Sequence, residues 1–305
     1  MLSPGSDAFS ELDLEEIPSP YPQVRVWTLA DLRAATLERP APIVPGWGIR
    51  KAGKVIFTGA GGRGKITLLL QLACDLAAGR PLLGHPQLAV HGDPQRVLLY
   101  MAEDPLPEVR YRLLRQLEEL GYCWEVEERI HILDFSDRKL QVLTDEWALR
   151  VLADRIRQHG ATFAVLDPLV SLHDPDEDSN PQMRAVLDAA SPIAEETGCV
   201  FSLAPHEPKN PGNNGAAARG ASAIRDWCRT MLRLTSQKAG TGGSQRFQLD
   251  LDKANYGGTV WSLTLARKQD SYIFTPIDLE AAVTPRHVWE IVGREGNWLD
   301  DVQDR

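Results

Sequence analysis

The sequence predicts an α/β protein whose mostly parallel sheet is covered by helices on both faces. Strand-like apolar segments alternate with helical patterns over most of the chain, which is the order expected of successive βαβ units. Residues 162–167 form a strand that is apolar on both of its faces, as in a buried parallel sheet. The length of 305 residues allows one large domain with appendages, or two small domains.

The expected elements follow in chain order. Repeated prolines from Pro18 to Pro45 disfavour long helices near the N-terminus, apart from a helical pattern at residues 29–37. Three of the later helical patterns stop at Gly79, Gly121 and Gly160, the residue type that most often follows a helix. We expect strands at 55–58, 96–101, 130–135, 162–167 and 199–204, and helices at 66–78, 107–120, 145–159 and 181–196.

The C-terminal third has a different pattern. Short strand-like runs are joined by short turns there, which predicts antiparallel hairpins rather than further βαβ units. One last helix is expected at residues 284–293. The four runs lie at 230–234, 245–251, 260–266 and 272–276.

Composition narrows the class of protein. A net charge of −9 argues against a strongly basic nucleic-acid binder, but it allows basic residues gathered into one channel. No stretch approaches the roughly 18 consecutive apolar residues of a membrane span. The polar, acidic N-terminus resembles neither a signal peptide nor a transit peptide. Four scattered cysteines without a C-x-x-C pair suit reduced thiols in a cytoplasmic protein, and Cys74 and Cys199 are expected to be buried.

A phosphate-binding loop is predicted where the first strand meets the first helix. The pattern G-x-x-x-x-G-K requires a strand before it and a helix after it, and both are expected here. Glycines let successive N–H groups point into one concave face, and the lysine reaches the β- and γ-phosphates of a nucleotide. The alternative is a glycine-rich turn with a surface lysine. The segment reads Gly59-Ala60-Gly61-Gly62-Arg63-Gly64-Lys65.

The position after the lysine departs from this pattern. A Ser or Thr hydroxyl there ligates Mg²⁺, whereas this chain has Ile66 followed by Thr67. Thr67 is the candidate substitute ligand for the metal, a doubtful one because it lies about 100° further round the helix. We expect ATP binding to survive, and hydrolysis with Mg²⁺ to be weakened.

Acidic residues end two of the predicted strands. Asp167 follows an apolar strand and should face the crevice where open α/β sheets bind ligands, a suitable place to hold the metal. Glu103 and Asp104 follow the second strand. They could serve the chemistry, with Asp104 as support, or they could cap the helix after Pro105.

These motifs resemble those of a known family, the RepA-type hexameric replicative DNA helicases, which are close to the DnaB-like and RecA-like ATPases. The likeness covers about residues 43–266, in blocks that keep the family's order. Ile66 and Pro205 depart from its pattern. The blocks are Gly59 to Lys65 (Walker A), Met101-Ala102-Glu103-Asp104-Pro105 (A-E-D-P), Leu166-Asp167-Pro168-Leu169 with His173 (Walker B), Ala204-Pro205-His206-Glu207-Pro208-Lys209 (H-H-x-x-K), Arg219-Gly220-Ala221-Ser222-Ala223 (R-G-S-S) and Lys253-Ala254-Asn255-Tyr256-Gly257 (K-x-x-x-G).

The resemblance implies roles for individual residues. In RecA-like ATPases the strand next to the phosphate-loop strand delivers the glutamate that orients the attacking water, and Glu103 would take that role. His206 would sense the γ-phosphate, unless it is a buried structural histidine. Arg219 would act as a finger into the neighbouring subunit's site, worth ~10³–10⁵ in rate, or else contact solvent or the DNA backbone. Lys209 and Lys253 could equally be solvated.

The resemblance also implies an assembly and a partner. It suggests a homo-oligomer, a hexameric ring that threads single-stranded DNA, with residues 207–218 as the DNA-facing loop. It implies a RecA-like ATPase domain at 43–277, between a partly disordered leader at 1–42 and a tail at 278–305. Two alternatives stay open: a regulator in which nucleotide binding sets oligomer state, and a mobile-element or defence ATPase without helicase activity.

Overall fold

The computed structural model describes residues 26–135, 142–174, 179–205, 219–237 and 244–277. The chain divides into two compact units, residues 1–39 and 40–305, and each is described by itself. The expected helix at 284–293 lies outside the described residues. None of the described helices is long and apolar enough to cross a membrane.

The first unit contains one short helix, α1 (Leu29–Ala34). It begins with a capping box, in which Asp31 donates its N–H to the Thr28 hydroxyl and Thr28 donates its N–H to the Asp31 carboxylate. It ends three residues before the predicted Leu37, because Ala35 is extended. No residue of α1 is buried, so no packing supports a longer helix.

The second unit is built on a nine-stranded sheet, which confirms the predicted fold class. Its order is β11-β10-β9-β8-β3-β7-β6-β4-β5. The strands from β8 to β5 run parallel, whereas β9, β10 and β11 are added antiparallel as the predicted hairpins. The strands are β3 (Lys54–Gly59), β4 (Val97–Met101), β5 (Ile130–Ile132), β6 (Phe163–Asp167), β7 (Val200–Leu203), β8 (Thr230–Ser236), β9 (Ser244–Ala254), β10 (Ser262–Lys268) and β11 (Thr275–Pro276).

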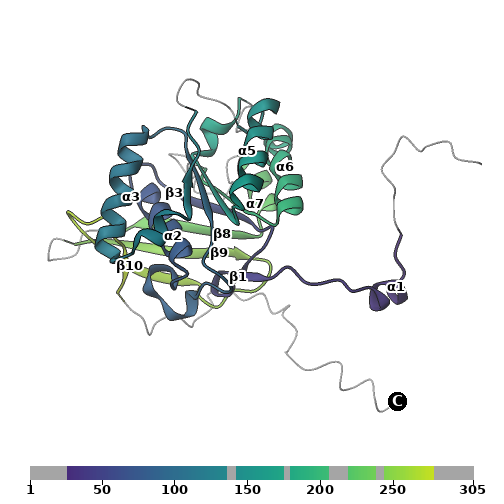
Figure 1. The fold of residues 1–305 in the computed structure, drawn as a ribbon, viewed down its shortest axis with the longest axis horizontal. Coiled ribbons are helices and arrows are strands. Elements are labelled where there is room, and N and C mark those ends of the chain that lie inside the picture. The colour runs from purple at the N-terminus through teal and green to yellow at the C-terminus, as the bar shows by residue number, and fades with distance from the viewer. Residues whose placement is uncertain (1–25, 136–141, 175–178, 206–218, 238–243, 278–305) are drawn as a thin grey trace, which may run out of the picture. The chain divides into compact units, whose positions relative to one another are not determined.

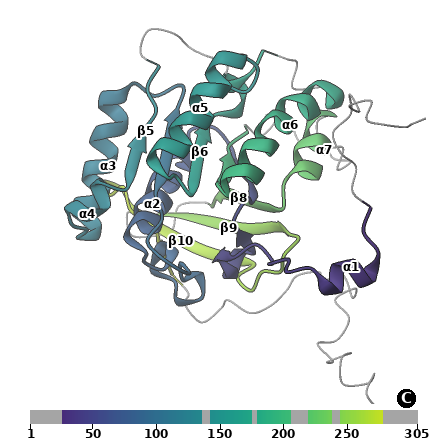
Figure 2. The same cartoon turned by 45° about the vertical axis from the view of Figure 1, so that its right-hand side comes forward.

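Helices cover both faces of the parallel part of this sheet (Figures 1 and 2). Alternate residues of β4 show the two layers: Val97 and Leu99 pack with the first helix group, Leu98 and Tyr100 with the second. The first group is α2 (Lys65–Ala78), α3 (Leu106–Leu120) and α4 (Trp124–Glu127); the second is α5 (Glu146–His159), α6 (Asn180–Thr197) and α7 (Arg219–Trp227).

Three predicted strands have different boundaries in the structure. The run at 272–276 contributes only β11, because the N–H and carbonyl of Phe274 bind Gln71 of α2 instead of a strand. The strand expected at 260–266 begins at Ser262, since Val260 donates its N–H to the Gly46 carbonyl. The three-residue β5 is likewise shorter than the expected 130–135.

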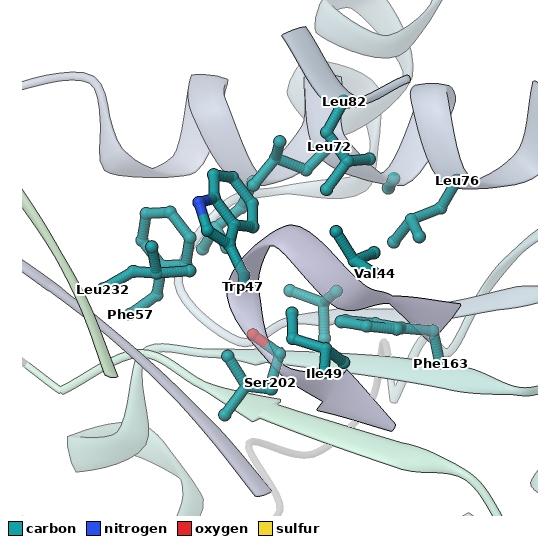
Figure 3. A pocket seen from close by; sticks show the side chains of 14 residues that line it. Val44, Trp47, Ile49, Phe57, Leu72, Leu76, Leu82, Phe163, Ser202 and Leu232 are labelled. Atoms are coloured by element: carbon teal, nitrogen blue, oxygen red, sulfur yellow. The ribbon is translucent and has the colours of Figure 1, made fainter. Parts of the chain in front are cut away.

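A small two-stranded sheet closes the core on the α2 side. It consists of β1 (Pro42–Val44) and β2 (Ile49–Arg50), joined by the 3₁₀ turn η1 (Pro45–Trp47). Trp47 of this segment lies between Leu72 of α2 and the strand residue Phe57 (Figure 3). The cavity beside them has a volume of about 20 Å³. That is room for about one water molecule, so the cavity is a packing gap and not a ligand site.

Replacing Trp47 should test how much this closing segment contributes. Trp47 is 1% exposed, so Trp47→Ala leaves a large void and should lower the free energy of unfolding by about 3–5 kcal/mol. Trp124 of α4 is 67% exposed, and Trp124→Ala should change the free energy of unfolding by less than about 0.5 kcal/mol. Urea denaturation measures both. Equal effects of the two variants would contradict this account of the core.

Candidate functional site

The glycine loop joins β3 to α2, as predicted. β3 ends at Gly59, α2 begins at Lys65, and the residues from Ala60 to Arg63 are exposed. Gly64 has a φ of 87°, a left-handed backbone that glycine adopts without strain. A Cβ placed on Gly61 or Gly62 would meet nothing within 4 Å among the described residues. The loop therefore has open space in front of it.

The loop also has unused backbone donors. Within the described part of the chain, no acceptor binds the N–H groups of Gly61, Gly62 and Gly64. They lie at the N-terminus of α2, a 14-residue helix whose dipole favours an anion there. Free donors, open space and a helix N-terminus together fit the phosphate groups of a nucleotide.

The structure brings Lys65 and Asp167 together. Lys65 is 6% exposed and Asp167 is 2% exposed. The Lys65 ammonium donates a hydrogen bond to the Pro205 carbonyl at 3.1 Å, and it lies 3.6 Å from Oδ1 of Asp167. Lys65 follows the loop after β3, Asp167 ends β6 and Pro205 follows β7, so the parallel arrangement of three strands assembles the pair.

The environment of Asp167 suits a metal ligand. Burial raises the pKa of this carboxyl to about 6, opposed by the Lys65 ammonium and reinforced by the nearby carboxylate of Glu103. Its Oδ1 is buried, with no hydrogen-bond partner among the described residues. No group of three or more His, Cys, Asp or Glu side chains in the described ranges could hold a metal alone. Mg²⁺ typically takes one or two carboxylates and completes its shell with phosphates and water, so the residues present fit it.

The two residues after Lys65 do not point to a second metal ligand. Ile66 is partly buried and packs against the apolar cluster that contains α2. Thr67 is 7% exposed, and its carbonyl accepts a hydrogen bond from Gln116 of α3 at 2.7 Å. The metal role proposed for the Thr67 hydroxyl stays a prediction.

The expected position of the Glu103 strand is wrong. The resemblance placed this strand next to the phosphate-loop strand, but β7 and β6 lie between β3 and β4. Strand β4 is instead paired with β6, with Met101 opposite Asp167. Glu103, two residues after Met101, therefore still lies near the Asp167 carboxylate. Ser171, in the 3₁₀ turn η4 (Leu169–Leu172) after β6, donates a hydrogen bond to Glu103 at 3.1 Å. The catalytic role of Glu103 stays a prediction.

The capping role considered for Asp104 is also wrong. Pro105 is the N-cap of α3 and no side chain caps this end. Asp104 forms an ion pair with Arg112 at 2.9 Å, and Arg112 also binds Glu108 one turn before it. Asp104 lies just before α3, and a charge-assisted pair with the guanidinium of Arg112 is stronger than a hydrogen bond to a neutral backbone N–H, so the carboxylate binds Arg112 instead of capping the helix.

The remaining predicted residues lie at the edge of the described part. His206 and residues 207–218, including Lys209, lie outside it. Arg219 begins α7, and only its backbone is described. Lys253 of β9 is partly buried, and its ammonium donates a hydrogen bond to the Arg225 carbonyl of α7. Lys253 is therefore in contact with α7 and not simply solvated.

Two glutamines near the loop were missed in the sequence. Gln116 of α3 donates to the carbonyls of both Thr67 and Tyr272, at 2.7 and 2.9 Å. Gln71 of α2 accepts from the N–H of Phe274 at 2.7 Å and donates to its carbonyl at 3.0 Å. Both glutamines are 1% exposed or less. A polar residue inside the apolar run of α2 was the available signal, since buried amides need partners.

Comparisons with known proteins agree with this geometry. A family model described as an AAA domain matches residues 17–212. Among solved structures, the chain is similar to a KaiC-like protein from the hyperthermophilic archaeon Pyrococcus horikoshii, with a TM-score of 0.54 and 17% identity. That match covers 79% of this chain and 99% of the other. The likeness in structure confirms a RecA-like P-loop fold with an antiparallel extension.

Replacing Lys65 tests the site. Lys65→Ala removes the buried cation beside the loop, so nucleotide affinity should fall on the order of 100-fold or be lost. Lys51→Ala, at an exposed turn before β3, should leave affinity unchanged. Titration calorimetry with ATP and Mg²⁺ measures both. Unchanged affinity in Lys65→Ala would place the nucleotide elsewhere.

Proposed function

This chain belongs to the AAA domain family, and we propose that it is an ATP-hydrolysing ring ATPase that translocates on single-stranded DNA as a helicase. The setting would be replication of a plasmid or mobile element. One observation carries the ATPase part: a buried Lys65–Asp167 pair beneath an open glycine loop with free N–H groups. Such a site offers donors to phosphates and a carboxylate to a metal.

Binding follows from the loop and from Lys65. The N–H groups of Gly61, Gly62 and Gly64 take phosphate oxygens, and Lys65 exchanges its contact with the Pro205 carbonyl for the terminal phosphates. Bound Mg²⁺ supplies charge neutralisation on the β- and γ-phosphates. Asp167 would hold the metal with its carboxylate, which must be ionised to do so, and the Lys65 ammonium favours the ionised form.

Hydrolysis needs an ordered water, and Glu103 is the residue proposed to hold it. Glu103 lies two residues after β4, near Asp167, and the Ser171 hydroxyl donates a hydrogen bond to one of its carboxylate oxygens. The other oxygen is left to orient a water toward the γ-phosphate. Ile66 gives no oxygen at the usual hydroxyl position, so turnover is slower than binding would suggest.

The proposed ring depends on two sequence blocks that would act across a subunit interface, the one that begins at Arg219 and the one that begins at Lys253. Arg219 begins α7, and Lys253 of the K-x-x-x-G block binds the α7 backbone at Arg225. This hydrogen bond holds the two blocks together within one subunit. Both blocks could then contact a neighbouring subunit through one surface. We propose that Arg219 enters the adjacent site of a hexamer, and that His206 and the segment 207–218 respond to nucleotide and DNA.

A second candidate is a nucleotide-dependent regulatory or defence ATPase without helicase activity. Ile66 favours it, because a chain that binds nucleotide without efficient hydrolysis can use the bound state itself as the output.

Turnover measurements separate the two functions. Ile66→Thr should raise the ATPase rate on the order of tenfold, since it restores one oxygen while phosphates and water supply the others. Single-stranded DNA should raise the rate of both forms if the chain is a translocase. A fast, DNA-stimulated ATPase that Ile66→Thr does not improve would refute the impairment. The regulatory function would be favoured by a different result: slow ATP turnover that single-stranded DNA does not change in the wild type or in Ile66→Thr, together with an oligomeric state that depends on nucleotide.

Mixed rings test the trans role of Arg219. Arg219→Ala should lower turnover at least ~100-fold with nucleotide affinity nearly intact. Adding Lys65→Ala subunits, inactive themselves but carrying Arg219, should restore part of the activity. Arg184→Ala on the exposed face of α6 is the matched control and should behave as wild type. An equal loss in a strictly monomeric preparation would refute action across an interface.

A further inference from the structure

One arginine lies against the glycine loop although it is about 200 residues away in the sequence. Arg267 is on β10, and a Cβ placed on Gly64 would lie 3.3 Å from its Nη1. The same Cβ would lie 3.0 Å from the ring of Phe274. The space beside Gly64 is therefore occupied by the Arg267 guanidinium and an aromatic ring of the same subunit.

Two aromatic rings and one amide hold this guanidinium in place. Its Cζ lies 5.6 Å from the ring centre of Phe247 and 5.3 Å from that of Phe274, within cation–π range. Nη2 donates to the Gln245 side chain across the β9–β10 pair, at 2.9 Å. Phe274 is itself fixed to α2 through Gln71. The position of Arg267 is thereby tied to the helix that the loop begins.

Among the residues that the structure describes, Arg267 is a cation without a carboxylate partner. No Asp or Glu within the described ranges lies within ion-pair distance of its guanidinium, and its Nε is buried without an acceptor. Burial lowers the pKa of Arg267, partly offset by the nearby Tyr272 hydroxyl. Arg233 of β8 shows the contrast: Asp252 binds it with two hydrogen bonds of 2.8 and 3.0 Å.

A half-buried cation without a counter-ion is costly unless a ligand supplies the charge. We propose that Arg267 is a second side-chain cation of the nucleotide site, which binds phosphate oxygens of the nucleotide in its own subunit's loop. The proposal rests on the proposed binding of nucleotide at this loop. Lys65 comes from the start of α2 and Arg267 from β10, so two separate elements supply the cations. Arg267 acts within its own subunit, unlike the role proposed for Arg219.

The experiment compares ligands that share phosphates but not the base. Arg267→Gln should weaken ATP and inorganic tripolyphosphate by the same factor, ~10- to 100-fold, the usual range for a charge-assisted contact. Arg267→Lys keeps the positive charge without the planar guanidinium, so its affinity for both ligands should fall by a smaller factor. Arg246→Gln, exposed on the neighbouring β9, should match wild type for both ligands. Calorimetry gives the affinities, and thermal melting checks that each variant is folded.

The outcomes separate this proposal from the proposed function. If wild type binds ATP and Arg267→Gln binds ATP and tripolyphosphate equally well, the role of Arg267 is refuted and the nucleotide site stands. Loss for ATP alone would assign Arg267 to the base or ribose and refute the phosphate contact. If wild type binds neither ligand, the nucleotide site itself is wrong and this proposal falls with it. Should Arg267→Gln not fold, an Arg267→Lys affinity equal to wild type for both ligands refutes the fork-like contact.

Discussion

A buried lysine at the start of α2 and a buried aspartate at the end of β6, 3.6 Å apart, form the interaction on which the site depends. Strands β3 and β6 are not neighbours, because β7 lies between them and supplies the Pro205 carbonyl that Lys65 also contacts. Removing two charges from water costs several kcal/mol per ion, which only close opposite charges and hydrogen bonds offset. The relative register of three parallel strands therefore decides whether this pair is tolerable.

The antiparallel extension packs against the same glycine loop and helix. Gln71 and Gln116 fasten the segment around Tyr272 and Phe274 onto α2 and α3 with three hydrogen bonds, and a fourth, from Gln116 to the Thr67 carbonyl, joins α3 to α2. Through this attachment, β9 and β10 bring Phe247 and Arg267 to the edge of the glycine loop. What looked in the sequence like a separate group of hairpins is thereby coupled to the helix that follows the phosphate loop.

Local patterns were enough to predict the strand–loop–helix unit at Gly59 to Lys65, the helix ends at glycine, and the antiparallel C-terminal strands. Strand order was not predictable in the same way, because it depends on pairing between segments far apart in the chain. For that reason Glu103 was assigned to a strand beside β3, whereas β4 pairs with β6. The ion pair of Asp104 with Arg112, and the position of Arg267 beside Gly64, likewise depend on tertiary packing that a motif does not contain.

Nearly every residue of α2 from Lys65 to Ala77 is buried, and Ile66 is the partly buried one among them. A helix enclosed on all sides cannot slide or tilt without repacking the strands, helices and C-terminal segment around it. We therefore expect α2 to keep its position relative to the sheet. If nucleotide binding changes the conformation of this site, we expect the change in the exposed residues 60–63 before α2 and not in α2 itself.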